Sequence, residues 1–285
     1  MKQMGFEIGA LQNELWQVRK QRRFVMRSSE ERLHELVENA WSEDSLAQLV
    51  RKYGLCDVCD FSGLNISAAR VLVNCAIAAL YRYPLLRSRF CYLGSQKGYM
   101  ALVKKFTQCD AETMKALGLQ HICGAELARS FGQGLLEFMA EPSRGTGNVL
   151  AQAVLAGGFL DGVLLDERDF STERFREIKE SLEESVRIGH FAKDCASVSA
   201  VIFHEIGHLL DSLCGVSEGA AVQEAFREGR ERKIAKELSA YAATSPAEYV
   251  AEGFAECMSS GAPRRAARAV AEAIAKSYQT LEASR

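Results

Sequence analysis

The chain has 285 residues, of which 48% are apolar and 25% are charged, a composition typical of globular domains and unlike that of disordered or collagen-like chains. The length predicts one or two domains of about 150 residues each. The formal charge is -2, from 35 Lys and Arg against 37 Asp and Glu, so no overall positive charge favours nucleic acid or an anionic membrane as a partner.

The N-terminal residues do not resemble a secretory signal peptide. Their apolar positions are interrupted by Glu7, Gln12, Asn13 and Glu14, whereas a signal peptide has a continuous apolar block. The longest apolar stretches, such as residues 71–81, are also much shorter than the roughly 20 residues that span a bilayer. We therefore expect a cytoplasmic protein with no transmembrane segment, or one exported without a cleaved signal.

The cysteine content predicts free thiols. The chain has nine cysteines, an odd number, and most of them lie among residues with helical spacing, which fits buried thiols in a reducing compartment better than a disulfide framework. Cys56 and Cys59 form a C-x-x-C pair without a second half. Because structural zinc takes four protein ligands, we favour core thiols over metal or redox use for this pair.

The first predicted helix carries Ile8, Leu11, Leu15 and Val18 on one face. The chain then becomes basic over residues 19–27. Such a cluster could contact an acidic partner, but a charged run of this kind is more often a solvated helix face. We therefore interpret it as exposed helix surface.

The next predicted helices have recognisable ends. Ser28 and Glu31 have the spacing of a capping box. The helical run at 42–53 is followed by Gly54, a residue that commonly ends helices. A third helical run, at 66–83, is followed by a proline, which cannot continue it.

The middle of the chain is the least regular part. Glycines punctuate residues 85–158, where we expect short strands or irregular segments among helices. Residues 159–166, FLDGVLLD, form a short apolar run with polar residues after it, which predicts a strand. Residues 171–188 predict a charged amphipathic helix closed by Gly189. Since helices also dominate the C-terminal part, the predicted fold class is α+β and predominantly helical.

The strongest functional signal is the sequence HEIGH at 204–208, inside an apolar run that predicts a buried helix ending at Gly215. Residues four apart on a helix lie about 5–6 Å from one another on one face, so His204 and His208 can bind one zinc ion. Glu205 is then placed to reach a zinc-bound water. A chance match would bury two histidines and an acid without a partner, which is costly.

A catalytic zinc needs a third protein ligand and one open position. Ser245 can cap a helix that has Pro246 at its first position, and Glu248, Glu252 and Glu256 then recur every four residues along one face. We predict Glu248 as the third ligand and Glu252 as the group that accepts the free N–H of a ligating histidine.

The spacing leaves two alternatives for these carboxylates. Ser245 and Glu248 also have capping-box spacing, in which the carboxylate would close back on the serine backbone. The spacing does not decide between Glu248 and Glu252 as the zinc ligand. For Glu256 we expect a solvent-exposed or salt-bridge role.

The sequence HEIGHLLD, followed by a tyrosine, six residues and EYVAEGFAE, resembles the zinc metallopeptidase domain of anthrax toxin lethal factor and of lethal-factor-like peptidases of bacteria and phages. The resemblance is firm over residues 197–258 and looser from residue 159. It implies a zincin-like fold with a small sheet beside the motif helix. On this basis we divide the chain into a helical N-terminal segment, 1–60, and a zincin-like domain, 61–285, with its motif core at 159–260.

The resemblance also implies roles for individual residues. It makes His204, His208 and Glu248 the ligands of one Zn²⁺ per chain in a gluzincin-type site, and Glu205 the general base. It places Tyr241 at the position of a tyrosine that donates a hydrogen bond to the tetrahedral intermediate. On the residues alone, Tyr241 could equally be a core or surface aromatic before a helix.

The chain departs from the family at one place. Many relatives have a Gly-aromatic-His-Pro segment before the motif helix, where this chain has GHFA at 189–192. We therefore expect His190 to be an exposed loop histidine.

The implied function is that of a zinc metalloendopeptidase that acts on a peptide or protein substrate, with no nucleic-acid or membrane partner. We also expect the strand near residues 162–165 to pair with an extended substrate. One alternative is a catalytically silent zinc-binding assembly protein of phage or prophage origin. A weaker one is a binding module that uses the basic segment 19–27, which would bind in a salt-dependent manner.

Overall fold

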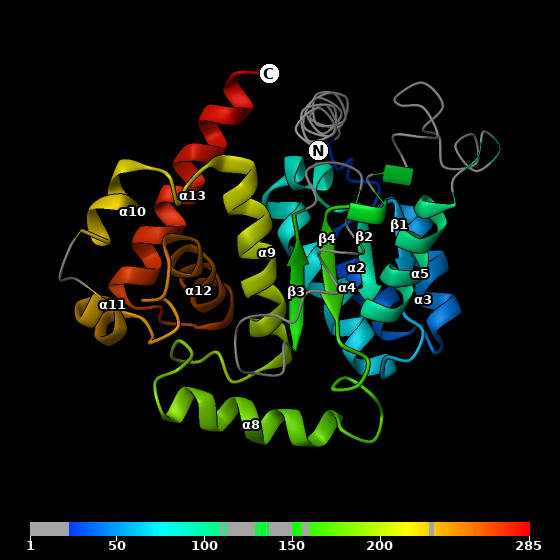
Figure 1. The fold of residues 1–285 in the computed structure, drawn as a ribbon, viewed down its shortest axis with the longest axis horizontal. Coiled ribbons are helices and arrows are strands. Elements are labelled where there is room, and N and C mark those ends of the chain that lie inside the picture. Colours follow the sequence, from blue (N-terminus) through cyan, green and yellow to red (C-terminus); the bar gives the residue numbers. More distant parts are fainter. Residues whose placement is uncertain are drawn as a thin grey trace.

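The computed structural model describes residues 23–108, 110, 112, 129–130, 132–134, 136, 150–155, 160–227 and 231–285. A mixed β-sheet lies in the middle of the molecule with helices packed around it (Figure 1). The α+β, predominantly helical class predicted from the sequence is confirmed. The first predicted helix, at residues 8–18, lies outside the described residues, as do residues 19–22 of the basic segment. Residues 23–27 form no helix, so the interpretation of this part as helix surface is wrong, although Arg23 and Arg27 are exposed.

The sheet has four strands among the described residues, in the spatial order β1-β2-β4-β3. These strands are β1 (Val58–Asp60), β2 (Tyr92–Ser95), β3 (Ala151–Val154) and β4 (Gly162–Leu165). β1, β2 and β4 run parallel, and β3 pairs antiparallel with β4, with Ala153 opposite Val163. β3 therefore forms one edge of the sheet.

The strand predicted within residues 159–166 is confirmed as β4, all four residues of which are buried. Its apolar run reflects its central place, because strands covered on both faces need apolar residues at every position. The expectation that this strand pairs with a substrate is wrong. β2 and β3 already occupy both of its edges, so among the described strands β3 forms the edge on this side of the sheet.

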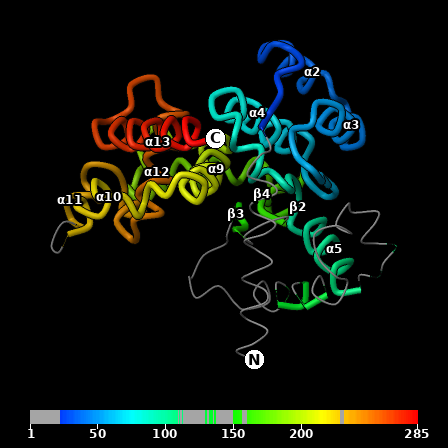
Figure 2. Tube along the Cα trace, turned by 90° about the horizontal axis from the view of Figure 1, so that it is seen from above, coloured from blue at the N-terminus to red at the C-terminus, as the bar shows by residue number. Residues whose placement is uncertain are grey.

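The N-terminal half contributes helices on both faces of the sheet. They are α2 (Glu30–Glu38), α3 (Glu43–Tyr53), α4 (Ile66–Arg82), the 3-10 helix η1 (Pro84–Ser88) and α5 (Gln96–Thr107). Figure 2 shows α4 and α9 on one side of the strands and α5 on the other.

The helix ends follow local chemistry, with one correction. Gly54 ends α3 in the left-handed conformation, with φ of 65°, where glycine carries no Cβ penalty. The predicted cap of α2 at Ser28 is wrong by one residue: Ser29 is the N-cap, and its side chain accepts from the Arg32 N–H. The Ser28 carbonyl instead accepts from the Tyr81 hydroxyl.

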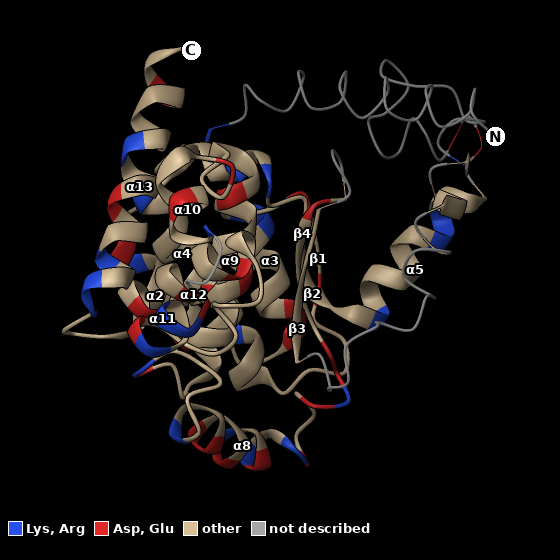
Figure 3. Cartoon of the chain, turned by 60° about the vertical axis from the view of Figure 1, so that its left-hand side comes forward, with Lys and Arg blue, Asp and Glu red and all other residues tan. Residues whose placement is uncertain are grey.

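The described chain after β4 is built from helices. They are α8 (Phe175–Arg187), α9 (Val198–Cys214), α10 (Ala220–Ala225), α11 (Glu231–Glu237), α12 (Pro246–Ser259) and α13 (Arg265–Ala283). α8 begins four residues later than the predicted run and is rich in both acidic and basic side chains (Figure 3). Among the described residues, no helix combines the length and apolarity needed to cross a membrane.

The described residues before position 60 share their core with the rest of the chain. Leu33 and Val37 of α2 belong to the same buried cluster as Ile202 of α9 and Phe254 of α12, and β1 pairs with β2. The division after residue 60 therefore falls at the end of β1, within one packed unit.

The α9 and α12 helices pack against each other at unusually close range. A Cβ added to Gly207 of α9 would lie 2.8 Å from the Cα of Ala251 on α12, closer than real side-chain atoms approach. The glycine in HEIGH thus lets the two backbones come together, and this contact sets the distance between the side chains that face each other across it.

Candidate metal centre

α9 places the motif side chains on its buried face. The Ser197 hydroxyl accepts from the Ala200 N–H at the helix N-terminus. Gly215 ends the helix with φ of 65°, as predicted. His204 and Glu205 are buried, and His208 is partly buried.

α12 brings the third side chain from forty residues further along the chain. Ser245 is its N-cap and Pro246 its first residue, as predicted. The Ser245 hydroxyl accepts from the Glu248 N–H at 3.1 Å, whereas the Glu248 carboxylate lies beside the histidine rings. The backbone N–H of Glu248 thus takes part in the helix cap, while its carboxylate remains available to the site.

Three ligand atoms converge at one point. The Nε2 atoms of His204 and His208 are 3.2 Å apart. Oε2 of Glu248 lies 3.0 Å from Nε2 of His204 and 3.4 Å from Nε2 of His208. Although buried, this Oε2 makes no acceptable hydrogen bond with the described residues. Two ring nitrogens and an unsatisfied carboxylate oxygen therefore face the same small space.

These separations fit a tetrahedral metal ion. With metal–ligand distances of about 2.0–2.2 Å, as for zinc, neighbouring ligand atoms of a tetrahedron lie about 3.3–3.6 Å apart. The observed values of 3.0, 3.2 and 3.4 Å are at or just below that range. His204, His208 and Glu248 could therefore hold a metal ion, and a cation would satisfy the orphaned oxygen of Glu248.

The charges of these groups are strongly coupled. Burial alone would lower the pKa of His204, but the adjacent carboxylates of Glu248 and Glu252 outweigh burial and raise this pKa to about 10. Burial would likewise raise the pKa of Glu248, but His204 and His208 lower it to about 2. The raised pKa of His204 favours a proton on this ring, and a metal ion that binds here has to displace it.

Glu252 holds the other nitrogen of His204. Its Oε1 lies 3.0 Å from Nδ1 of His204, and the carboxylate is 2% exposed, so this bond is shielded from water. An acceptor at Nδ1 keeps the proton on that nitrogen and directs the lone pair of Nε2 towards a metal ion. The tertiary structure thereby separates the two glutamates, placing Glu248 at Nε2 and Glu252 at Nδ1.

Glu205 contacts the open edge of the sheet. Its Oε2 accepts from the backbone N–H of Ala153 on β3 at 2.6 Å. Burial raises the pKa of Glu205, an effect partly offset by the two histidines and by the Ala153 N–H. A buried carboxylate with a raised pKa is suited to accept and return a proton near neutral pH.

Tyr241 lies against the ring of His204. Its ring stacks on the ring of His204, with centroids 5.5 Å apart and planes at 20°. Burial and the charges of Glu248 and Glu205 raise the pKa of Tyr241, so its hydroxyl stays protonated and can donate. His190 is exposed, as expected, but its ring also lies 5.4 Å from the ring of Tyr241.

The remaining candidates lie outside this cluster. Glu256 is 1% exposed and pairs with Arg264, so its role is a buried salt bridge and not a solvent contact. The Cys56 thiol donates to the Val58 carbonyl, and the described cysteines form no disulfide. His204, His208 and Glu248 are the only group found among the described residues with the spacing of a metal site.

Sequence reasoning missed the groups that surround the cluster. The Ala153 N–H and the Ala192 N–H act through the backbone, so their side chains carry no signal. Ser239 and Arg264 come from segments without a motif, and only their contacts reveal them.

Comparison of the chain with protein-family models, with curated proteins and with solved structures found no match. The HEIGH motif and the geometry of the cluster are therefore the features that indicate a function.

Proposed function

We propose that this protein is a zinc-dependent metallopeptidase that hydrolyses peptide bonds with an activated water molecule. The observation that carries the proposal is that the ligand atoms of His204, His208 and Glu248 lie 3.0–3.4 Å from one another. The buried carboxylate of Glu205 follows His204 directly in the chain. Zinc bound there would supply a Lewis acid and lower the pKa of a water molecule to about 7.

The side chains around the cluster would each have a role in this reaction. Glu205 would accept a proton from the attacking water and transfer it to the leaving amine nitrogen. Tyr241, held protonated, would donate a hydrogen bond to the oxygen that becomes negative when the carbonyl is attacked. Glu252 would keep the His204 ring in one orientation throughout.

The edge of β3 supports a peptide as the substrate. The Leu150 carbonyl accepts from the Asp166 N–H, and the orientation of backbone groups alternates along a strand, so Ala151 and Ala153 direct their backbone groups away from β4. An extended peptide could pair with this edge whatever its side chains. Because the Ala153 N–H already contacts Glu205, such a peptide would lie beside the proposed base.

Metal analysis combined with a peptide-library digest tests the proposal. Purified protein should contain one zinc per chain, and mass spectrometry should detect cleavage that a chelator abolishes and added zinc restores. Protein that binds no zinc would contradict the proposal. Zinc at one per chain without any cleavage would favour the silent assembly module instead.

Replacing Glu205 by Gln tests the assigned base. The amide cannot take up a proton, so turnover should fall by about 100-fold or more, while zinc content and the melting temperature stay close to those of the wild type. Glu180→Gln, at an exposed position on α8, is the matched control and should keep full activity. A Glu205→Gln variant that cleaves peptides at the wild-type rate would refute the assignment.

A further inference from the structure

The turn that carries Tyr241 is tied to a metal ligand through one buried hydroxyl. Ser239 is fully buried. Its hydroxyl donates to Oε2 of Glu252 at 2.8 Å and accepts from the Ala242 N–H at 2.9 Å. The other oxygen of Glu252 contacts Nδ1 of His204 at 3.0 Å. A chain of three hydrogen bonds therefore joins the backbone beside Tyr241 to the imidazole of His204.

A second segment is fastened to the same carboxylate. Oε2 of Glu252 also accepts from the Ala192 N–H at 2.8 Å. The backbone N–H of Tyr241 donates to the His190 carbonyl at 3.0 Å, and that of Ala240 donates to the Gly189 carbonyl at 2.9 Å. The segment before α9 and the turn before α12 are thus joined to each other, and both are joined to Glu252.

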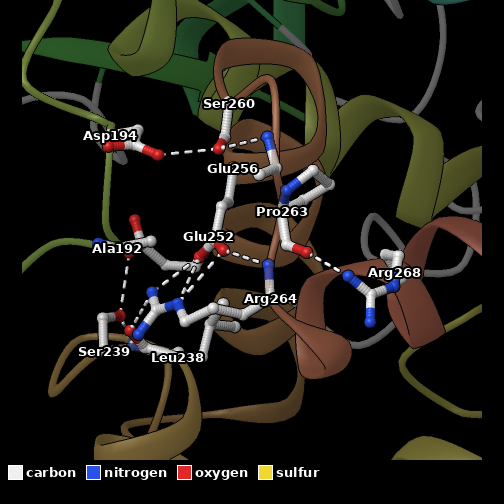
Figure 4. A network of polar contacts seen from close by, with 12 residues as sticks. Ala192, Asp194, Leu238, Ser239, Glu252, Glu256, Ser260, Pro263, Arg264 and Arg268 are labelled. Atoms are coloured by element: carbon white, nitrogen blue, oxygen red, sulfur yellow. Dashed lines mark hydrogen bonds and ion pairs between the residues drawn. The ribbon is translucent and has the colours of Figure 1, made fainter.

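Arg264, at the N-cap of α13, fixes the outer end of this network (Figure 4). Its guanidinium contacts the buried carboxylate of Glu256 through Nε at 3.0 Å and through Nη2 at 2.6 Å. Nη2 also donates to the Leu238 carbonyl at 2.5 Å, directly before Ser239. The backbone of the turn is therefore held on both sides of the serine hydroxyl.

We propose that Ser239 is a positioning residue that fixes the phenol of Tyr241 relative to the imidazole of His204. Its hydroxyl joins the turn that carries the phenol to the carboxylate that orients the ring. The inference deepens the proposed peptidase function and rests on it. The stacked arrangement of the two rings, at 5.5 Å and 20°, is the geometry that this link preserves.

Ser239→Ala removes the link, and Ser259→Ala is its matched control. Ser259 lies at the end of α12, and its hydroxyl is buried without a hydrogen-bond partner among the described residues. Partners that orient metal ligands typically account for about 10- to 100-fold in metal affinity or activity. We expect Ser239→Ala to lower kcat about 10-fold at saturating zinc and to weaken zinc binding about 10-fold, with KM unchanged. Ser259→Ala should change none of these.

A double-mutant cycle with Tyr241→Phe separates positioning from a general structural role. If Ser239 acts through the phenol, Ser239→Ala should have almost no further effect on kcat at saturating zinc once that hydroxyl is gone, because coupled residues are not additive. The same 10-fold loss in both backgrounds, or an unchanged kcat in Ser239→Ala alone, would overturn the inference. If Ser239→Ala does not fold, Ser239→Cys, whose S–H is only a weak donor, takes its place in the cycle.

Amide hydrogen exchange gives a readout that does not depend on activity. In the metal-free protein, Ser239→Ala should speed exchange at Ala242, Tyr241 and Ala192 together, and Ser259→Ala should not. Unchanged exchange at these amides would overturn the link. If the wild-type protein cleaves no peptide, the proposed function fails, and the exchange experiment still tests whether Ser239 fastens this turn.

Discussion

At the scale of single residues, His204 shows how the cluster is ordered. Its Nε2 lies 3.0 Å from Glu248 and its Nδ1 lies 3.0 Å from Glu252, while its ring face is covered by Tyr241. The ring therefore has no freedom to rotate without breaking contacts on two sides. If His204 binds the proposed metal ion, its ring is oriented before the metal arrives, which reduces the cost of assembling the site.

Tyr241→Phe tests the assigned oxyanion donor at this scale. Removing one such donor costs about 100-fold or more in kcat in enzymes where it has been measured. We expect kcat to fall by about 100-fold with KM and zinc content unchanged, because the remaining ring still stacks on His204. Steady-state kinetics on one cleaved peptide measure this. An unchanged kcat would show that Tyr241 only packs against His204 and is not the donor.

At the scale of elements, the site depends on how closely α9 and α12 pack. Each helix is defined by local signals, a capping serine at its start and, for α9, a glycine at its end. Neither signal sets the distance between the helices. That distance follows from Gly207, whose missing side chain leaves room for the backbone of Ala251.

Gly207→Ala tests this contact. Alanine favours the helix by up to about 1 kcal/mol, but its Cβ would lie 2.8 Å from the Ala251 Cα, and overpacking of this kind costs about 1–3 kcal/mol. We expect a net loss of stability in urea unfolding and weaker zinc binding, because α12 has to move away from α9. Ser212→Ala, at an exposed position near the end of α9, should leave the stability and the zinc affinity unchanged. A more stable Gly207→Ala protein with full zinc affinity would contradict the role of this contact.

At the scale of the whole molecule, the cluster joins parts of the chain that are far apart in sequence. His204 and His208 come from α9, Glu248 from α12 and the Ala153 N–H from the edge of the sheet. The hydrophobic core extends continuously from α2 to α13. The cluster therefore lies inside a scaffold that packs without it, and a bound metal ion would add a cross-link between elements.

Zinc should therefore stabilise the folded protein without being needed for folding. An ion that binds only the folded state at 100 times its Kd adds about 2.7 kcal/mol. We expect zinc to raise the melting temperature and a chelator to reverse the shift, with the helical circular dichroism signal unchanged at 25 °C. Glu205→Gln should respond like the wild type, and Glu248→Gln should respond weakly or not at all. Complete unfolding in chelator would contradict this expectation, because it would show that the hydrophobic core cannot maintain the fold without the metal ion.

The sequence by itself determined the features that depend on local spacing. The apolar period of α9 and its glycine end, the serine cap of α12, the apolar run of β4 and the i,i+4 spacing of His204 and His208 each depend on residues that are close together in the chain, so periodicity and capping chemistry are sufficient to predict them. The error at the start of α2 has the same local origin, since Ser28 and Ser29 are both good caps.

Only the tertiary structure decided which partners meet across the fold. Spacing left the roles of Glu248 and Glu252 open, and the packing of α12 on α9 placed one at Nε2 and the other at Nδ1 of His204. The tertiary structure also placed β3, and not β4, at the edge of the described sheet. It brought the Ser239 hydroxyl into hydrogen-bond contact with Glu252. The physical reason is that these side-chain contacts link residues from 13 to 48 positions apart, at distances fixed by the packing of helices and strands and not by any pattern along the chain.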